Sequence, residues 1–158
     1  MTITKNKISG ALFIFLIILL PIGCNDKNDN PGTEIPNVYV NFYLQPDGID
    51  FIPAQGWKYI DQEGYRGIII YRIDQFTFNA YERTCPFDAQ KDCARVEVTP
   101  SGILMIDSCC MSYYNILDGM PAGGPTSLPL KVYFTEFDGI TLHVYNTPWL
   151  FRFYELKK

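Results

Sequence analysis

Hydrophobic and polar residues alternate with a period of two over most of the chain from residue 38 onward. Residues 38–44 show this alternation first. Residues 68–71 form an apolar run, residues 76–80 alternate, and these two segments flank a turn. Residues 96–98 and 103–106 flank a Pro-Ser-Gly turn and predict a second hairpin. This period is typical of strands, and no helical stripe interrupts it. The pattern therefore predicts an all-β fold, a small antiparallel sandwich or barrel.

The N-terminal segment differs from the rest of the chain because it has the order of charges and apolar residues of a bacterial signal peptide. Lys5 and Lys7 precede the apolar residues 11–20, and Pro-Ile-Gly then leads to Cys24. The apolar run is shorter than the ~18 to 20 residues of a spanning helix. We expect residues 1–23 to be cleaved and Cys24 to be acylated, with residues 24–33 as a polar tether. The protein would then be a lipid-anchored protein of the bacterial cell envelope, at the outer membrane.

The remaining chain, residues 34–158, has the length of one domain. The full sequence holds 13 basic and 17 acidic residues. Removal of residues 1–23 takes two lysines away, so the mature net charge is −6. No basic cluster remains in this acidic domain, which argues against a nucleic acid partner. The membrane is the expected partner through the N-terminal lipid anchor, and a protein partner is left open.

Two short segments of this domain carry cysteine and aspartate residues. Residues 85–88 read Cys-Pro-Phe-Asp, and residues 107–115 read Asp-Ser-Cys-Cys-Met-Ser-Tyr-Tyr-Asn, followed by a Gly-Gly-Pro-Thr segment. Together they resemble the Rieske family, in which a Cys-x-His loop and a Cys-x-x-His loop hold a 2Fe-2S cluster. The resemblance implies an antiparallel β-sandwich with a small inserted loop subdomain, here residues 84–129.

The resemblance places Cys85, Phe87, Asp107 and Cys110 at the four ligand positions, so most ligands differ from the family pattern. Rieske chemistry needs two imidazoles on one iron. The chain has one histidine, His143, and its place in an alternating run predicts a solvated strand position. We therefore expect no cofactor and no metal. The alternative is an electron-transfer protein that binds a 2Fe-2S cluster with altered ligands.

Four cysteines remain after Cys24, an even number in an exported chain, which favours disulfides. Counting alone allows three pairings. The resemblance implies a loop-to-loop bridge between Cys93 and Cys109, which leaves Cys85 and Cys110 facing each other as a second bridge. The next alternative pairs Cys85 with Cys93 and leaves Cys109 and Cys110 as a vicinal pair or as free thiols.

Other sites are disfavoured by the sequence. A four-cysteine zinc site lacks Cys-x-x-Cys spacing, and no basic residue beside Cys109 and Cys110 would activate a redox disulfide. Ser112 has no base nearby in sequence, and no substrate logic selects Asp88 or Asp107 as a catalytic carboxylate. We therefore predict a protein that is not an enzyme: a degenerate Rieske-like envelope lipoprotein, most simply a binding or assembly component.

Overall fold

The computed structural model describes residues 34–146 and contains ten strands and no helix within them. The predicted signal peptide, the lipidation site Cys24 and the tether at residues 24–33 lie outside the described residues. Within residues 34–146, no helix is long and apolar enough to cross a membrane. The all-β fold class predicted from the alternating pattern is confirmed.

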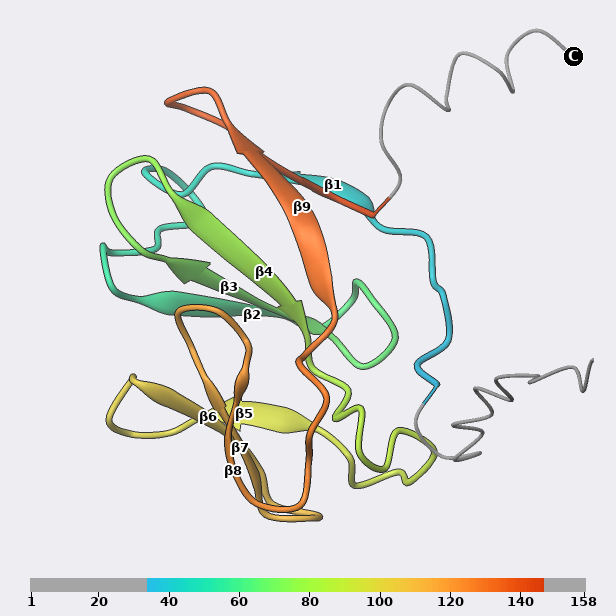
Figure 1. Ribbon diagram of the computed structural model, residues 1–158. Helices are drawn as coiled ribbons and strands as arrows, with labels where there is room; N and C mark the ends of the chain where they lie inside the picture. The colour runs from blue at the N-terminus through green and yellow to red at the C-terminus, as the bar shows by residue number, and fades with distance from the viewer. Residues whose placement is uncertain (1–33, 147–158) are drawn as a thin grey trace, which may run out of the picture.

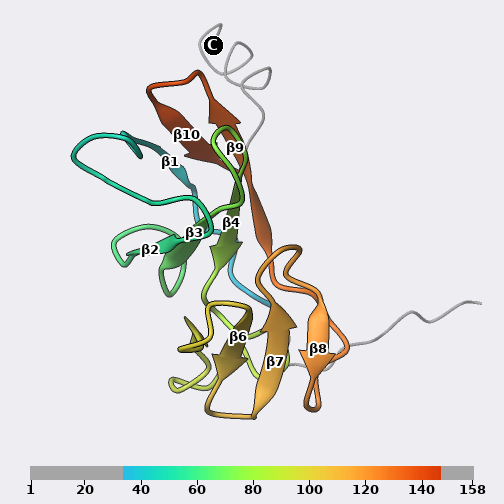
Figure 2. The same ribbon diagram turned by 90° about the vertical axis from the view of Figure 1, so that its left-hand side faces the viewer.

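A six-stranded antiparallel sheet forms the base of the molecule, in the spatial order β1-β10-β9-β4-β3-β2. It occupies the upper part of Figures 1 and 2. Its strands are β1 (Asn41–Leu44), β2 (Trp57–Ile60), β3 (Ile68–Arg72), β4 (Phe78–Glu82), β9 (Val132–Phe137) and β10 (Leu142–Tyr145).

A second, four-stranded antiparallel sheet is inserted between β4 and β9 and lies below the base in both views (Figures 1 and 2). It runs in the simple order β5-β6-β7-β8, so each strand pairs with the next one along the chain. Its strands are β5 (Val96–Val98), β6 (Leu104–Asp107), β7 (Ser112–Asn115) and β8 (Pro121–Gly123).

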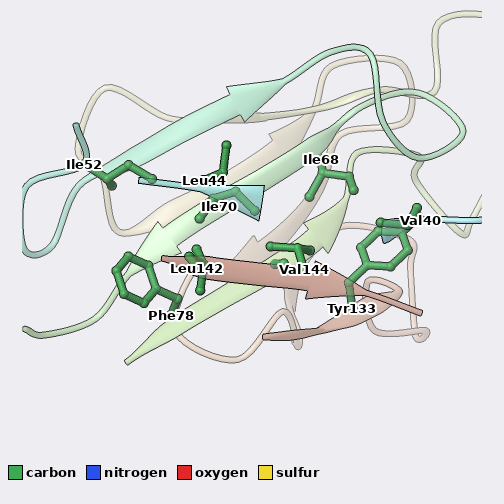
Figure 3. Close-up of a cluster of buried hydrophobic side chains, with 10 residues drawn as sticks. Val40, Leu44, Ile52, Ile68, Ile70, Phe78, Tyr133, Leu142 and Val144 are labelled. Atoms are coloured by element: carbon green, nitrogen blue, oxygen red, sulfur yellow. The ribbon is translucent and has the colours of Figure 1, made fainter. Parts of the chain in front are cut away.

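The base sheet encloses the first of two hydrophobic cores, because strands from its two halves face each other across it (Figure 3). Leu44 of β1 and Leu142 of β10 are register partners in this core. Ile68 and Ile70 of β3 contribute from the other half. The full buried set is Val40, Leu44, Ile52, Ile68, Ile70, Phe78, Ala80, Tyr133, Leu142 and Val144.

A second core joins the base to the inserted sheet, and it explains why β3 is buried at every position. Successive side chains of a strand point to opposite faces. Ile69 of β3 therefore packs with Met105 of β6 and Tyr114 of β7, while its neighbours Ile68 and Ile70 face the first core. This second core also contains the fully buried Cys85. The position of that thiol is thus fixed by packing against both sheets.

The structure refines the strand predictions. Both predicted hairpins are present, as β3-β4 and β5-β6. The alternation around His143 is real, but β10 begins at Leu142, and Ile140 is exposed in the preceding turn. His143 is half-buried because its ring stacks between Tyr43 and Tyr145, 4.4 and 4.5 Å away between ring centroids. It is therefore held more firmly than a solvated strand histidine.

Glu82, at the end of β4, is a fully buried carboxylate that five hydrogen bonds satisfy. It accepts from the backbone N–H groups of Tyr65, Arg66 and Thr84, from the Thr84 hydroxyl, and from the Tyr133 hydroxyl at 2.7 Å. Burial of a charge costs free energy unless hydrogen bonds compensate it. Glu82 therefore ties the loop before β3 and the start of the inserted region to β9.

We expect Glu82→Gln to lower the free energy of unfolding by about 2 kcal/mol or more, because its amide NH₂ would face N–H donors and leave them unsatisfied. Urea denaturation measures the change. Glu97→Gln is the control, since that side chain is 64% exposed and its ion pair with Arg83 is weak. Equal stability of the two variants would contradict the role given to Glu82.

Candidate metal centre

The first loop of the site follows β4 and returns to β5. It is closed by a β-bridge between Thr84 and Arg95 and by a backbone hydrogen bond from Cys85 to Ala94. Within it, the Lys91 N–H donates to the Asp88 carbonyl at 2.8 Å, which forms a turn. The loop therefore holds the Cys85 side chain, and the Asp88 side chain three residues later, against the inserted sheet.

The second loop is the tight connection between β6 and β7. Asp107 and Ser112 are register partners at its two ends, and the Met111 N–H donates to the Asp107 carbonyl at 2.8 Å. Met111 has a positive φ of 60°, which few residues other than glycine adopt. The Asp107 carboxylate also accepts the Cys109 N–H at 2.9 Å. These bonds fold the loop back so that Cys110 and Asp107 lie together.

A disulfide between Cys93 and Cys109 joins the two loops. This is the first pairing that the Rieske resemblance implied. The second predicted bridge is absent: Cys85 and Cys110 are free thiols, with their sulfur atoms 3.6 Å apart. That correction has a physical reason, because each sulfur has another partner. Cys85 Sγ lies 3.2 Å from the Tyr114 hydroxyl, and Cys110 Sγ contacts oxygen atoms of two neighbours.

Four potential metal ligands converge where the loops meet. They are Cys85, Asp88, Asp107 and Cys110, and one ligand atom from each lies within 4.8 Å of all the others. Cys110 Sγ is 3.2 Å from Asp107 Oδ2. Cys85, Asp88 and Asp107 are buried, whereas Cys110 is half-buried. The group therefore has one side open to its surroundings, at Cys110.

Asp88 is the member of this group with the least compensation for its charge. Its side chain is 6% exposed, and neither carboxylate oxygen has a hydrogen-bond partner. Lys91 Nζ lies 3.4 Å from Asp88 Oδ2, but that side chain is 61% exposed and the contact lacks hydrogen-bond geometry. Buried polar groups are nearly always hydrogen-bonded, so an unsatisfied carboxylate calls for a cation.

Burial is the main cause that raises the pKa of the Cys85 thiol, and the Asp107 carboxylate raises it further, against the opposing effect of Tyr114. Burial likewise raises the pKa of the Cys110 thiol. Both sulfurs are therefore thiols at neutral pH in the metal-free protein, and a bound metal would displace their protons. Burial also raises the pKa of the Tyr114 hydroxyl beside Cys85, which keeps it a hydrogen-bond donor.

The glycine-rich segment after β8 covers the second loop. Gly124 has a φ of +82°, and a Cβ atom there would lie 2.2 Å from the Met111 carbonyl oxygen. Only glycine permits so close an approach of two backbones. The segment therefore seals the loop that carries Cys110 from the side of β8.

The prediction of no cofactor and no metal is wrong on this geometry. The Rieske resemblance placed Phe87 at the position of a lost ligand and implied a disulfide between Cys85 and Cys110. In the structure, Phe87 is exposed at the surface, and the free thiols of both cysteines lie beside buried carboxylates. Asp88 was missed as a ligand because it stands one position after the expected histidine, and its burial without hydrogen bonds leaves no signal in the sequence.

The Rieske resemblance implies a 2Fe-2S cluster, and the four ligand residues match that cluster in chemistry but not in geometry. Their chemistry suits iron, because thiolates bind iron–sulfur centres and carboxylates bind harder ions. The geometry does not suit two irons. A cluster needs two ligands on each of two metal atoms, and here all four ligand atoms converge within 4.8 Å. A two-iron cluster therefore does not fit this arrangement of the four ligand residues.

No protein-family model and no curated protein matches the chain. A chain from a complex of reduced oxygenase and oxidized ferredoxin in carbazole 1,9a-dioxygenase is similar in structure, with 20% identity and a TM-score of 0.46 over 65% of this chain and 92% of that one. The ferredoxin of carbazole 1,9a-dioxygenase from Nocardioides aromaticivorans IC177 has 14% identity and a TM-score of 0.46, covering 70% of this chain and 100% of that one.

The small subunit of a putative NADH-dependent nitrite reductase from Mycobacterium tuberculosis has 16% identity and a TM-score of 0.42, covering 70% of this chain and 98% of that one. In the present structure, the inserted sheet and its two meeting loops occupy the places that the sequence motifs predict. Residues 34–146 therefore have the architecture that the motif resemblance implied, an antiparallel base that carries an inserted subdomain.

Proposed function

We propose that this protein is an electron carrier with an iron centre bound by Cys85, Asp88, Asp107 and Cys110. The observation that supports it is the convergence of two free thiols and two buried carboxylates between loops that a disulfide joins. This proposal keeps electron transfer with altered ligands from the alternative considered from the sequence, but not its 2Fe-2S cluster, and it replaces the cofactor-free binding component. Iron would supply a one-electron couple at this position.

The side chains around the ligands would hold them and limit access of water. Ser112 Oγ lies 3.0 Å from Cys110 Sγ, and the Tyr114 hydroxyl lies 3.2 Å from Cys85 Sγ. Groups that hydrogen-bond to metal ligands orient them and tune a metal's properties. Cys110 is the least buried ligand. Phe87 in the first loop and Met111 in the second are exposed, and these residues form the tip of the site. A protein partner would therefore exchange electrons at this tip.

The setting of the proposed carrier is the bacterial cell envelope. The signal peptide at residues 1–23 and acylation of Cys24 would anchor it to the outer membrane, with residues 24–33 as a tether. A disulfide between Cys93 and Cys109 is consistent with an oxidising compartment outside the cytoplasm. We propose that the protein carries out no enzymatic reaction of its own.

Protein purified without air from iron-replete cells should contain iron, and it should show visible sulfur-to-iron charge-transfer absorption once a chemical oxidant has converted the iron to Fe³⁺. Asp88→Asn should lose both, because it removes a ligand, while Asp92→Asn in the same loop should keep them, since that residue is exposed and outside the group. Absence of iron from the unaltered protein, both as purified and after anaerobic addition of Fe²⁺, would refute the proposed function.

The reduction potential of the iron centre should lie below the range of Rieske centres, which begins at about −150 mV. Anionic thiolate and carboxylate ligands stabilise the more positive, oxidised iron more strongly than neutral imidazole does. Protein-film voltammetry measures the midpoint. A midpoint well inside the Rieske range would contradict this expectation.

Replacement of Cys24 by Ser should release the protein from the membrane into the soluble fraction, because no acyl chain can then be attached. Fractionation of cells that express each form, followed by mass spectrometry of the N-terminus, tests this. Membrane retention of Cys24→Ser with residues 1–23 removed would contradict acylation as the anchor.

A further inference from the structure

The number of metal atoms in the proposed iron centre can be inferred from the distances between its ligand atoms. Resting on the proposed function, we propose that Cys85, Asp88, Asp107 and Cys110 bind a single four-coordinate metal ion in place of a two-iron cluster. The site would be a mononuclear centre with two sulfur and two oxygen ligands inside a Rieske-like fold.

The sulfur–sulfur distance and one sulfur–oxygen distance are close to those of one coordination sphere, and all four ligand atoms lie within 4.8 Å of one another. Two sulfurs bound to one tetrahedral ion at ~2.3 Å lie roughly 3.7 Å apart, and a sulfur and an oxygen lie roughly 3.6 Å apart. Cys85 Sγ and Cys110 Sγ are 3.6 Å apart, and Cys110 Sγ is 3.2 Å from Asp107 Oδ2. One ion placed among these atoms would reach all of them with small side-chain adjustments.

The same distances exclude a cluster in this arrangement of the loops. Bridging sulfides separate the two irons of a cluster, so ligands of different irons cannot all be in mutual contact. The Rieske register would place Cys85 on one iron and Cys110 on the other, yet their sulfurs touch. The Cys93–Cys109 disulfide links residues adjacent to these ligand segments and restrains the loops from separating.

Asp88 supplies the independent evidence for a cation. The phenyl ring of Phe87 offers no ligand atom, and the next side chain, Asp88, instead brings a carboxylate into the group. That carboxylate is 6% exposed and has no hydrogen bond to either oxygen. A folded protein rarely leaves a carboxylate in this state, and a metal ion would satisfy both its charge and its lone pairs.

The charges of the ligands indicate the class of ion. Two thiolates and two carboxylates carry four negative charges when a metal is bound, and the cation paired with Asp88, Lys91, is largely exposed. A first-row transition ion of intermediate softness, Fe²⁺ or Zn²⁺, suits mixed sulfur and oxygen ligands. The missing Cys-x-x-Cys spacing disfavours a zinc site of four cysteines. It does not bear on the present group, in which each loop contributes one cysteine and one aspartate.

Anaerobic titration with Co²⁺ tests the number of ions directly. Metal-free protein is prepared with a chelator and without a thiol reductant, so that the Cys93–Cys109 bridge is retained. We expect saturation at one Co²⁺ per chain, with intense visible bands of tetrahedral cobalt and sulfur-to-cobalt charge transfer in the near ultraviolet. Octahedral, weakly coloured cobalt or no saturable binding would overturn the single-ion site.

Incubation with excess Fe²⁺ and sulfide separates failure of this inference from failure of the proposed function. One iron per chain without acid-labile sulfide supports both. Two irons and two sulfides per chain overturn the single-ion site but leave an iron carrier. Tight binding of one Zn²⁺ with no retained iron supports the single-ion site and overturns the carrier. No metal of any kind overturns both.

Asp88→Asn is the variant that separates a ligand from a structural residue. We expect its Co²⁺ affinity to fall by more than the roughly 10–100-fold that loss of an outer-shell partner costs. In metal-free buffer its Tm should stay equal or rise, because the change removes an unsatisfied buried charge. Asp92→Asn should match the unaltered protein in both measurements. Unchanged Co²⁺ affinity in a folded Asp88→Asn protein would overturn the assignment.

Discussion

The candidate site depends on two loops, distant along the chain, being held against each other by the Cys93–Cys109 disulfide. Closing a loop of this length stabilises a fold by ~3 kcal/mol in the chain-entropy model. The disulfide does this with residues adjacent to, but outside, the ligand group. Cys85 and Cys110 therefore remain free thiols in contact with each other. Structural cross-linking and metal binding are thus assigned to different cysteines of the same two loops.

Burial of the carboxylates near the site decides their roles, because water cannot stabilise the charge of a buried carboxylate and another group must do so. The packing of β3 between two cores fixes Cys85 and the inserted sheet around it. Glu82 and Asp88 are both buried carboxylates of the region where β4 leads into the inserted sheet, and their surroundings differ. The Glu82 carboxylate accepts five hydrogen bonds, whereas the Asp88 carboxylate accepts none. The first carboxylate is structural, and the second is the one that we propose binds a metal ion.

Much of the fold could be predicted from the sequence, because period-two alternation and turn residues specify hairpins locally. The β3-β4 and β5-β6 hairpins followed from such signals, whereas the inserted subdomain followed from the resemblance to the Rieske motifs. The site was predicted only in part. Alignment to the Rieske ligand positions located Cys85, Asp107 and Cys110. It treated Phe87, Asp107 and Cys110 as replaced ligands and concluded that the metal was lost. The role of Asp88 depends on burial and on missing hydrogen bonds, which no local sequence pattern reports.

X-ray absorption at the iron edge of the anaerobically loaded protein tests the central claim most directly, because it identifies the atoms bound to the metal. We expect one shell of two sulfur neighbours at about 2.3 Å and two oxygen neighbours at about 2.1 Å, distances known for thiolate and carboxylate ligands. No iron neighbour should be present. An iron–iron contribution, or a shell of water oxygens without sulfur, would contradict the account.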